Sequence, residues 1–405
     1  MNAIVVDREL WTTTGEALLG DAIALRRAIH SEPEIGLDCP KTTAKIKQAL
    51  AGLPLELREG PSTTGLVAIL RGPSNGRTVL LRGDMDALPL TEDTGLEFCS
   101  QHAGAMHACG HDTHVAMLAG AAHALSAQRE KLNGTVIFMF QPGEEGYHGA
   151  RFMIEDGLLD KPTPDAAFAL HISPNMPAGV FASRTGPLLA SADEFEVKVT
   201  GKGGHGAMPH ETIDPVPIAA EMVLALQTLV SRKVAPNESA VLTVGKIESG
   251  TTDNVIPETA TLLGTIRTLD ERIRTLMHEG VARVCTHVAL AHAARAEAEV
   301  TPGFPVTVND GRIVELAQRT AQALFGEHGW RTMPTPMMGA EDFAYVLQKV
   351  PGAMAFLGAV PEGGDYHSCC GLHSNRMVLD ERVMARGVAM HCAMAEAFLN
   401  GEAVV

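Results

Sequence analysis

A thiol and three imidazoles occur within nine residues of this 405-residue chain, in the segment 106–114. Cys109 and His111 are separated only by Gly110, which has no side chain to crowd them. A loop here can turn both side chains toward one point, which is a common way to bind a thiophilic divalent metal ion. Free cysteine is also an ordinary small buried residue, and histidine an ordinary residue at a helix start. The segment alone therefore leaves both interpretations open.

Two acidic pairs each follow a predicted apolar strand. Asp84 and Asp86 alternate at a strand end, where they could ligate a metal or hold a metal-binding histidine by its far nitrogen. Glu144 and Glu145 are adjacent, and neighbouring carboxylates repel each other unless a cation or abundant water is present. Beside a metal, one could coordinate while the other takes a proton from water and returns it to a leaving group. A solvated acidic turn is the alternative for each pair.

Two further histidines are candidate ligands by position. His171 ends a predicted strand, and His373 lies in the segment 371–375 near the C-terminus. A lone histidine is usually not a ligand. Cys109, His111, Glu145 and His171 nevertheless all fall just after predicted strands, as converging ligands should.

The elements that would position these residues are short apolar strands that alternate with helices. Strands that are apolar throughout, alternating with helices, indicate a mixed α/β sheet with helices on both faces. In such sheets the chemistry collects just past the carboxyl ends of the strands. The predicted strands are 66–70, 78–82, 135–140 and 166–172, and the predicted helices are 15–51, interrupted at 31–34, and 113–131.

Residues 188–300 follow a different pattern. Segment 194–199 alternates polar and apolar residues, which is typical of a strand with one solvated face. A predicted order of strand, helix, strand, strand, helix, strand indicates a small antiparallel sheet with two helices on one face. We therefore predict an inserted α+β, ferredoxin-like domain at 188–300 within a discontinuous larger domain of 1–187 and 301–405. The elements of the insertion are predicted at 194–199, 215–232, 240–249, 259–267 and 270–294, and a last helix at 380–399.

Composition excludes several classes of partner. A chain of 405 residues exceeds the usual size of one hydrophobic core, so two domains are expected. A net charge of -16 argues against nucleic acid and anionic membranes, and neither a secretory signal nor an apolar run of about twenty residues occurs. Seven cysteines without a CxxC pair predict a reduced, cytoplasmic protein.

Segment 201–206 formally matches the GxGxxG pattern of dinucleotide-binding proteins. Such a site requires a helix that starts at once and an acidic residue about twenty positions on. Pro209 and Pro215 delay the helix here, and no acid ends a following strand at that distance. A nicotinamide-dependent oxidoreductase is therefore disfavoured.

Together the motifs resemble those of the M20 family of metallopeptidases and aminoacylases. More narrowly, they resemble the branch with hippurate hydrolases, N-acyl-amino-acid amidohydrolases and plant auxin-conjugate hydrolases. The matching motifs run in family order at 84–89, 107–112, 141–145, 170–174, 203–209, 254–257, 339–343 and 372–374.

The resemblance implies a zinc-peptidase-like catalytic domain that binds two divalent metal ions, with zinc, manganese, cobalt or nickel all compatible with a cysteine-containing site. It implies Glu144 as the general base, and Asp84 and Asp86 as residues that support the ligands. The metal ligands that it implies are Cys109, His111, Glu145, His171 and His373.

The resemblance also assigns roles to the inserted domain, as a lid and as the contact of a homodimer or larger homo-oligomer. His205 matches a residue that stabilises the oxyanion, often in the partner subunit's site. Asn254 and Arg267 match positions that hold the substrate's carboxylate, for which arginine offers a two-pronged donor.

The implied activity is hydrolysis of the amide bond of a small N-acyl amino acid. A metallocarboxypeptidase or dipeptidase of the same family is the alternative. A non-catalytic binding protein on this scaffold would lack a ligand or the base, and none is missing. Asn375 replaces a usual proline, and 146–149 is less glycine-rich than in hippurate hydrolases, so the preferred substrate does not follow from any one relative.

Overall fold

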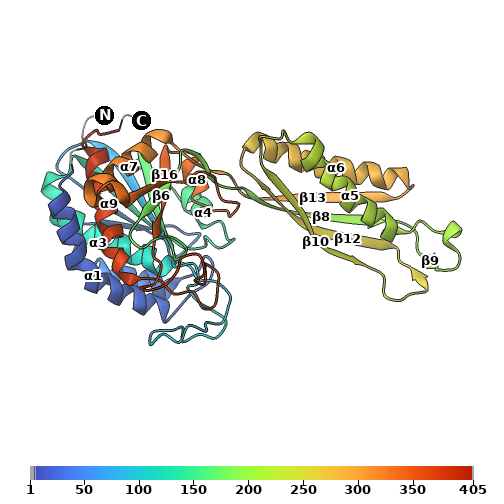
Figure 1. The fold of residues 1–405 in the computed structure, drawn as a ribbon, viewed down its shortest axis with the longest axis horizontal. Helices are drawn as coiled ribbons and strands as arrows, with labels where there is room; N and C mark the ends of the chain where they lie inside the picture. The colour runs from blue at the N-terminus through green and yellow to red at the C-terminus, as the bar shows by residue number, and fades with distance from the viewer. Residues whose placement is uncertain (1–3, 5, 404–405) are drawn as a thin grey trace. The chain divides into compact units, whose positions relative to one another are not determined.

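The computed structural model describes residues 4 and 6–403, which form two compact units (Figure 1). Unit 1 holds the described residues up to Leu188, then Val308–Thr335, and those from Tyr345 onwards. Unit 2 holds Leu189–Thr307 and the separate segment Pro336–Ala344. The insertion was expected at 188–300, and its role as a lid or dimerisation domain stays a prediction.

Unit 1 is built on an eight-stranded mixed sheet, which confirms the predicted α/β class. Its strand order is β1-β2-β4-β3-β5-β16-β6-β15. The central strands β4, β3, β5 and β16 are parallel, so their carboxyl ends meet at one edge. The strands are β1 (Glu56–Glu59), β2 (Leu66–Arg71), β3 (Arg77–Asp84), β4 (Gly134–Gln141), β5 (Ala166–Ser173), β6 (Phe181–Ser183), β15 (Trp330–Thr332) and β16 (Gly352–Gly358).

Helices cover both faces of this sheet (Figure 1). The first helix begins at Arg8, earlier than predicted, because the Asp7 side chain accepts a hydrogen bond from the Leu10 amide and caps it. The helix predicted at 113–131 begins at His111 and ends at Ala127, before a short 3-10 turn. The helices are α1 (Arg8–His30), α2 (Pro40–Ala49), α3 (His111–Ala127), α4 (Gly149–Glu155), α7 (Gly311–Phe325), α8 (Ala344–Leu347) and α9 (Met384–Leu399).

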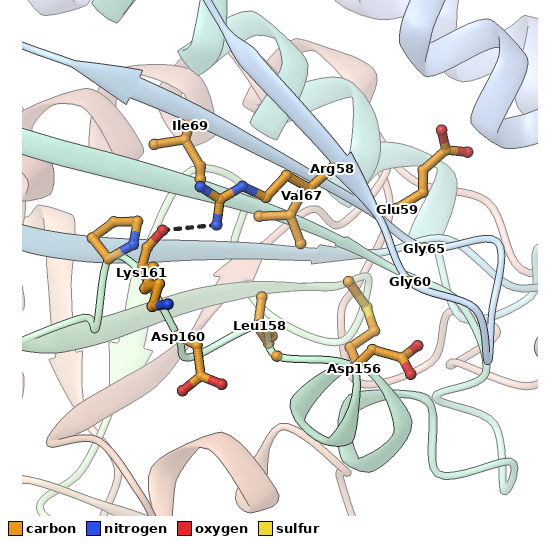
Figure 2. A pocket seen from close by; sticks show the side chains of 13 residues that line it. Arg58, Glu59, Gly60, Gly65, Val67, Ile69, Asp156, Leu158, Asp160 and Lys161 are labelled. Atoms are coloured by element: carbon orange, nitrogen blue, oxygen red, sulfur yellow. Dashed lines mark hydrogen bonds between the residues drawn. The ribbon is translucent and has the colours of Figure 1, made fainter.

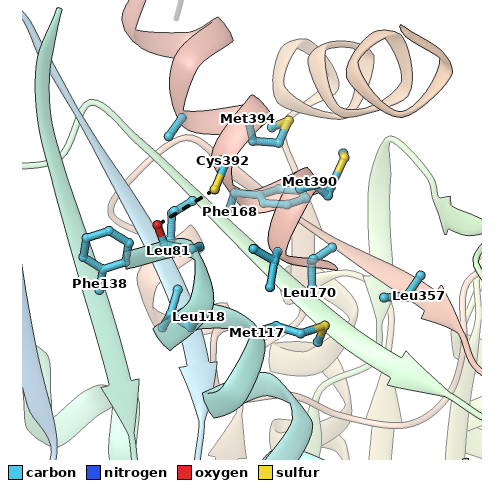
Figure 3. Packing of buried hydrophobic residues seen from close by; sticks show 14 of the residues in the cluster. Leu81, Met117, Leu118, Phe138, Phe168, Leu170, Leu357, Met390, Cys392 and Met394 are labelled. Carbon is cyan, nitrogen blue, oxygen red and sulfur yellow. Dashed lines mark hydrogen bonds between the residues drawn. The ribbon is translucent and has the colours of Figure 1, made fainter. Parts of the chain in front are cut away.

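The core of unit 1 lies between the sheet and helices α3 and α9 (Figure 3). Leu81 and Phe168 of the sheet pack against Met117 of α3 and Met390 of α9, and all four side chains are buried. Helix α1 crosses α9 closely at Gly15, where an added Cβ would lie 2.3 Å from a carbonyl oxygen. This packing holds the start of α3, and so the segment 106–114, against the ends of the strands.

Unit 2 contains a four-stranded antiparallel sheet of order β10-β12-β8-β13, with α5 and α6 on one face (Figure 1). Phe195, Val197 and Val199 alternate along β8 and face the helices, as the sequence predicted. A two-stranded ribbon extends from this sheet. A separate pair of strands, β7 (Gly186–Leu189) and β14 (Thr307–Asn309), lies where the chain passes from one unit to the other. The elements are β8 (Ala192–Thr200), α5 (Pro215–Lys233), β10 (Ala240–Ser249), β12 (Thr259–Thr268), α6 (Glu271–Ala291), β13 (Arg295–Phe304), and the ribbon strands β9 (Gly204–His205) and β11 (Val255–Ile256).

Among the described residues, no helix is both long enough and apolar enough to cross a membrane.

Candidate active site

The candidate site lies at the carboxyl ends of β3, β4 and β5. Its most constrained backbone position is Gly110, which separates Cys109 from His111. Gly110 has φ +83°, and an added Cβ would lie 2.4 Å from Ile172 Cγ2. Only glycine meets both conditions, because it adopts left-handed backbone without strain and leaves the space empty. This turn directs the thiol and the imidazole to the same place.

One cluster of donor atoms joins Cys109, His111 and His171, which lie within 4.8 Å of one another. The Cys109 Sγ lies 3.4 Å from His171 Nε2. His171 Nδ1 donates to the Ile172 carbonyl at 2.7 Å, so its Nε2 carries no proton and faces the thiol. His111 Nδ1 donates to the Asp86 carbonyl at 2.9 Å and likewise leaves Nε2 as a lone-pair donor. Both rings are thus held in the tautomer that a metal ligand needs.

A second cluster shares Cys109 and adds Glu145 and His373. The Glu145 Oε1 lies 3.3 Å from His373 Nε2 and 4.0 Å from His111 Nε2. The backbone amide of His373 donates to the Ala108 carbonyl at 2.8 Å, which docks its loop beside the thiol. The structure therefore brings together all the side chains that were predicted as ligands, from four separate parts of the chain.

The electrostatics of these clusters fit a bound cation. His111 Nε2 and Glu145 Oε1 are buried and have no hydrogen-bond partner among the described residues, although each faces other possible metal ligands. Burial raises the pKa of the Cys109 thiol. Contacts with Cys109 and Glu145 raise the pKa of His373 to about 10, so in the metal-free chain the protonated ring of His373 lies beside these two acceptors. A divalent cation would take the place of that proton and bind His111 Nε2 and Glu145 Oε1.

Asp86 supports the site from behind. Its Oδ1 accepts the amide of Glu144 and its Oδ2 accepts the amide of Glu145, both at 3.0 Å. Its own carbonyl accepts the proton of His111 Nδ1. One residue therefore fixes the ligand ring and the backbone of both glutamates. This is the arrangement that its predicted supporting role requires.

Asp84 is fully buried and has two partners that the sequence analysis did not single out. Its Oδ1 lies 2.5 Å from His114 Nδ1, and its Oδ2 lies 2.6 Å from Arg82 Nη1. Arg82 Nε donates to Gln141 Oε1 at 2.9 Å. Burial alone would raise the pKa of Asp84, but the charge of Arg82 and the hydrogen bond from His114 hold it well below its usual value. The carboxylate is therefore ionised beside His111.

A third buried network anchors the start of α3 to α1, and the sequence analysis did not predict it either. The Asp112 Oδ2 lies 2.9 Å from Arg26 Nε and 2.8 Å from His30 Nδ1. Burial would lower the pKa of His30, but the charge of Asp112 and a hydrogen bond to it raise that pKa to about 9. The sequence signal was the spacing of Arg26 and His30, which puts both on one face of α1.

In unit 2, the ribbon carries His205 opposite Val255, with Asn254 beside them. His205 is exposed, and its Nδ1 accepts the amide of Ala207 at 3.1 Å, so the proton is on Nε2. The Gly206 amide donates to the Asn254 carbonyl at 2.8 Å. The third predicted residue, Arg267, lies toward the other end of β12.

The distance between these residues follows from the strand geometry. Strand β12 begins at Thr259, which pairs with Thr200 where β8 leads into the ribbon. From Thr259 to Arg267 an extended strand rises about 26 Å. In a single copy of the chain, Asn254 therefore lies next to His205, and Arg267 lies far from both.

The protein has other hollows, and one lies on the edge of the sheet in unit 1 (Figure 2). It has a volume of about 280 Å³, and Val67 and Ile69 are among its apolar lining residues. Two other lining residues are joined by a hydrogen bond, which Arg58 donates to the Lys161 carbonyl at 2.7 Å. None of its lining residues belongs to a cluster of described residues that could hold a metal. The candidate metal ligands and acid–base residues therefore lie at the strand ends and not in this pocket.

Comparison with known proteins agrees with this geometry. Residues 80–397 match the model of the peptidase family M20/M25/M40. The chain is 39% identical to thermostable carboxypeptidase 1 of Saccharolobus solfataricus, over 93% of this chain and 95% of the relative. It is 41% identical to the N-acetyl-L-cysteine deacetylase of Bacillus subtilis, over 83% of this chain and 80% of the relative.

A solved structure gives the same result. It is a dinuclear metal-binding peptidase from Bacillus subtilis, 33% identical, with a TM-score of 0.83 over 95% of this chain and 99% of the other. The match with the family model extends over most of the chain, and the two curated relatives cover more still. The chain belongs to the peptidase family M20/M25/M40.

Proposed function

We propose that this protein hydrolyses the amide bond of N-acyl amino acids with two divalent metal ions, releasing a carboxylic acid and a free amino acid. The observation that carries the proposal is the pair of donor clusters that share Cys109, with Glu144 held next to them by Asp86. Family membership and the similarity to an N-acetyl-L-cysteine deacetylase support it.

The ions would be held by the thiolate, the carboxylate and the imidazoles of the two clusters. When bound, they supply positive charge that polarises the amide carbonyl and lowers the pKa of water. Zinc, manganese, cobalt and nickel all accept such a mixed donor set. The residues assigned as ligands are Cys109, His111, Glu145, His171 and His373.

Glu144 is the general base. Its side chain is 7% exposed, and it shares a cluster with His111 and Glu145, so its carboxylate lies at the ligands without needing to be one. It takes the proton of the attacking water and later gives it to the departing nitrogen. The amide hydrogen bond to Asp86 holds its backbone during both transfers.

His205 donates to the oxyanion of the tetrahedral intermediate through its Nε2–H, and Arg267 binds the substrate's carboxylate. An N-acyl amino acid is far shorter than the rise of about 26 Å from Thr259 to Arg267 along β12, and His205 lies beyond Thr259 on the ribbon. A site that uses both must therefore take them from two copies of the chain. We accordingly propose a homodimer in which His205 and Asn254 act in the partner's site.

We also propose a cytoplasmic location. All seven cysteines are unpaired, and Cys109 must stay reduced to serve as a ligand. Neither nucleic acid nor a membrane is a proposed partner, because the chain carries a net charge of -16.

The rival function is peptide hydrolysis, which the similarity to a carboxypeptidase favours. The metal-loaded protein should be assayed with N-acetyl, N-benzoyl and long-chain acyl amino acids beside unblocked dipeptides. We expect kcat/KM for the best blocked substrate to exceed that for any dipeptide by at least about tenfold, because an acyl group leaves no ammonium charge to bury. Preferential cleavage of unblocked dipeptides would replace this proposal with the rival.

A further inference from the structure

His114 is a fully buried imidazole that the proposed reaction does not use. It lies on α3, one turn after His111, and its ring centroid is 4.6 Å from that of His171 and 5.4 Å from that of His111. Together with Asp84 and His111 it forms a group whose donor atoms lie within 4.8 Å of one another. Its position therefore suits either a metal ligand or a residue that supports the ligands.

The hydrogen bonds of His114 decide between these roles. Its Nε2 accepts the backbone amide of Ile172 at 2.8 Å, so that nitrogen carries no proton and its lone pair is occupied. The proton is then on Nδ1, which donates to Asp84 Oδ1 at 2.5 Å. Both ring nitrogens are used, and neither has a lone pair left for a metal ion.

The ring of His114 joins strands β3 and β5 beyond the point where their own pairing ends. Strands β3 and β5 pair in parallel from Val79 and Ala166 to Arg82 and Ala169. Beyond these residues, Asp84 on one strand and Ile172 on the other are joined through the imidazole of His114.

The helix that carries His114 comes close enough for this contact because of Gly83. An added Cβ at Gly83 would lie 2.9 Å from the carbonyl oxygen of His114, so any larger residue would push α3 away from β3. The close approach of α3 thus inserts the ring between the two strand ends.

We infer that His114 is a positioning residue that spans the gap between the ends of β3 and β5 and sets the separation at which His111 and His171 can bind the same metal ion. Asp84 lies beside His111, with its Oδ2 3.4 Å from His111 Nε2, and Ile172 follows His171 directly. Fixing these two neighbours fixes the two ligands. The inference rests on the proposed metal site and concerns its affinity.

Three substitutions separate the two hydrogen bonds. His114→Asn keeps a donor near Nδ1 for Asp84 but loses the acceptor for the Ile172 amide. His114→Gln places an amide oxygen near Nε2 for Ile172 but loses the donor to Asp84. His114→Ala loses both. His123→Gln is the matched control, because His123 is also on α3 and donates to the Ala49 carbonyl, away from the site.

The test is titration of the metal-free proteins with Zn²⁺ and Co²⁺, measuring the dissociation constant and the number of ions bound at saturation. We expect His114→Ala to weaken binding about 10–100-fold, the usual effect of removing a partner that orients a ligand. The Asn and Gln variants should each weaken it less, and all variants should bind as many ions at saturation as the unsubstituted chain. The Co²⁺ absorption spectrum should keep its shape.

Loss of one ion at saturation in the Asn and Gln variants, with a changed Co²⁺ spectrum, would show that His114 is itself a ligand. Unchanged affinities with a lower Tm would show that it only stabilises the fold. Either result overturns the inference. If His114→Ala does not fold, the Asn and Gln variants decide. Failure of the unsubstituted chain to bind any metal would instead refute the proposed function.

Discussion

Replacing Glu144 with Gln should lower kcat about 10³-fold while the metal content stays the same. The amide of Gln has nearly the shape of the carboxylate but cannot take a proton from water, and positioned acid–base groups contribute typically 10²–10⁴-fold. The Glu144 backbone amide would still bond to Asp86, so the turn that carries Glu145 should be undisturbed. Steady-state kinetics on the best N-acyl substrate and elemental analysis of the same preparation measure both quantities.

Glu145→Gln is the matched control, since it changes the neighbouring carboxylate in the same way. Here we expect weaker metal binding, because Glu145 Oε1 is one of the buried atoms without a hydrogen bond that faces the other donors. Activity should then recover in part when metal is added in excess. Near-normal kcat of the Glu144 variant on every cleaved substrate would show that another group is the base.

The second large effect is on stability. Asp112→Asn should lower the free energy of unfolding of metal-free unit 1 by about 3 kcal/mol, since breaking a buried ion pair leaves uncompensated charge in the core. Arg26 and His30, which face Asp112, are 2% and 0% exposed. Both tryptophans, Trp11 and Trp330, belong to unit 1, so their fluorescence during urea denaturation follows this unit selectively.

The same network predicts a pH dependence. The pKa of His30 is raised from 6.5 to about 9 in the folded chain. Its contribution to the free energy of unfolding is therefore complete below pH 6.5 and is lost as the pH rises through 9. The shift corresponds to about 3 kcal/mol at most, at 1.36 kcal/mol per pKa unit. In Asp112→Asn this loss of stability between pH 6.5 and 9.5 should be much smaller. Equal slopes in the two proteins would contradict the assignment.

The parts of the fold that could be predicted are those with a local signal. The apolar strands around the site and the strands and helices of unit 2 have clear local patterns, and the ranges predicted for them agree with β2 to β5 and with β8, α5, β10, β12 and α6 to within a few residues. The short strands β6 and β15 were not predicted. Each has three residues, too few for a period, and forms because a neighbouring strand offers a hydrogen-bonded edge.

The residues around the ligands could not be predicted for a similar reason. Asp112 contacts Arg26 across 86 positions of sequence, and His114 contacts Ile172 across 58. No local pattern encodes such contacts, and the motif containing Asp112 and His114 reads equally well as a row of possible ligands. In the folded chain, both ring nitrogens of His114 are occupied and Asp112 faces α1.

The central claim is that side chains from distant parts of the sequence hold two metal ions beside Glu144. Its most direct test is elemental analysis of the metal-loaded protein after gel filtration, with the Glu144→Gln, His171→Ala and His373→Ala variants measured in parallel. We predict two metal ions per chain for the unsubstituted protein and for Glu144→Gln, and fewer for each of the two histidine variants. Full metal content in both histidine variants, or undiminished hydrolysis after a chelator has removed all metal, would contradict the account.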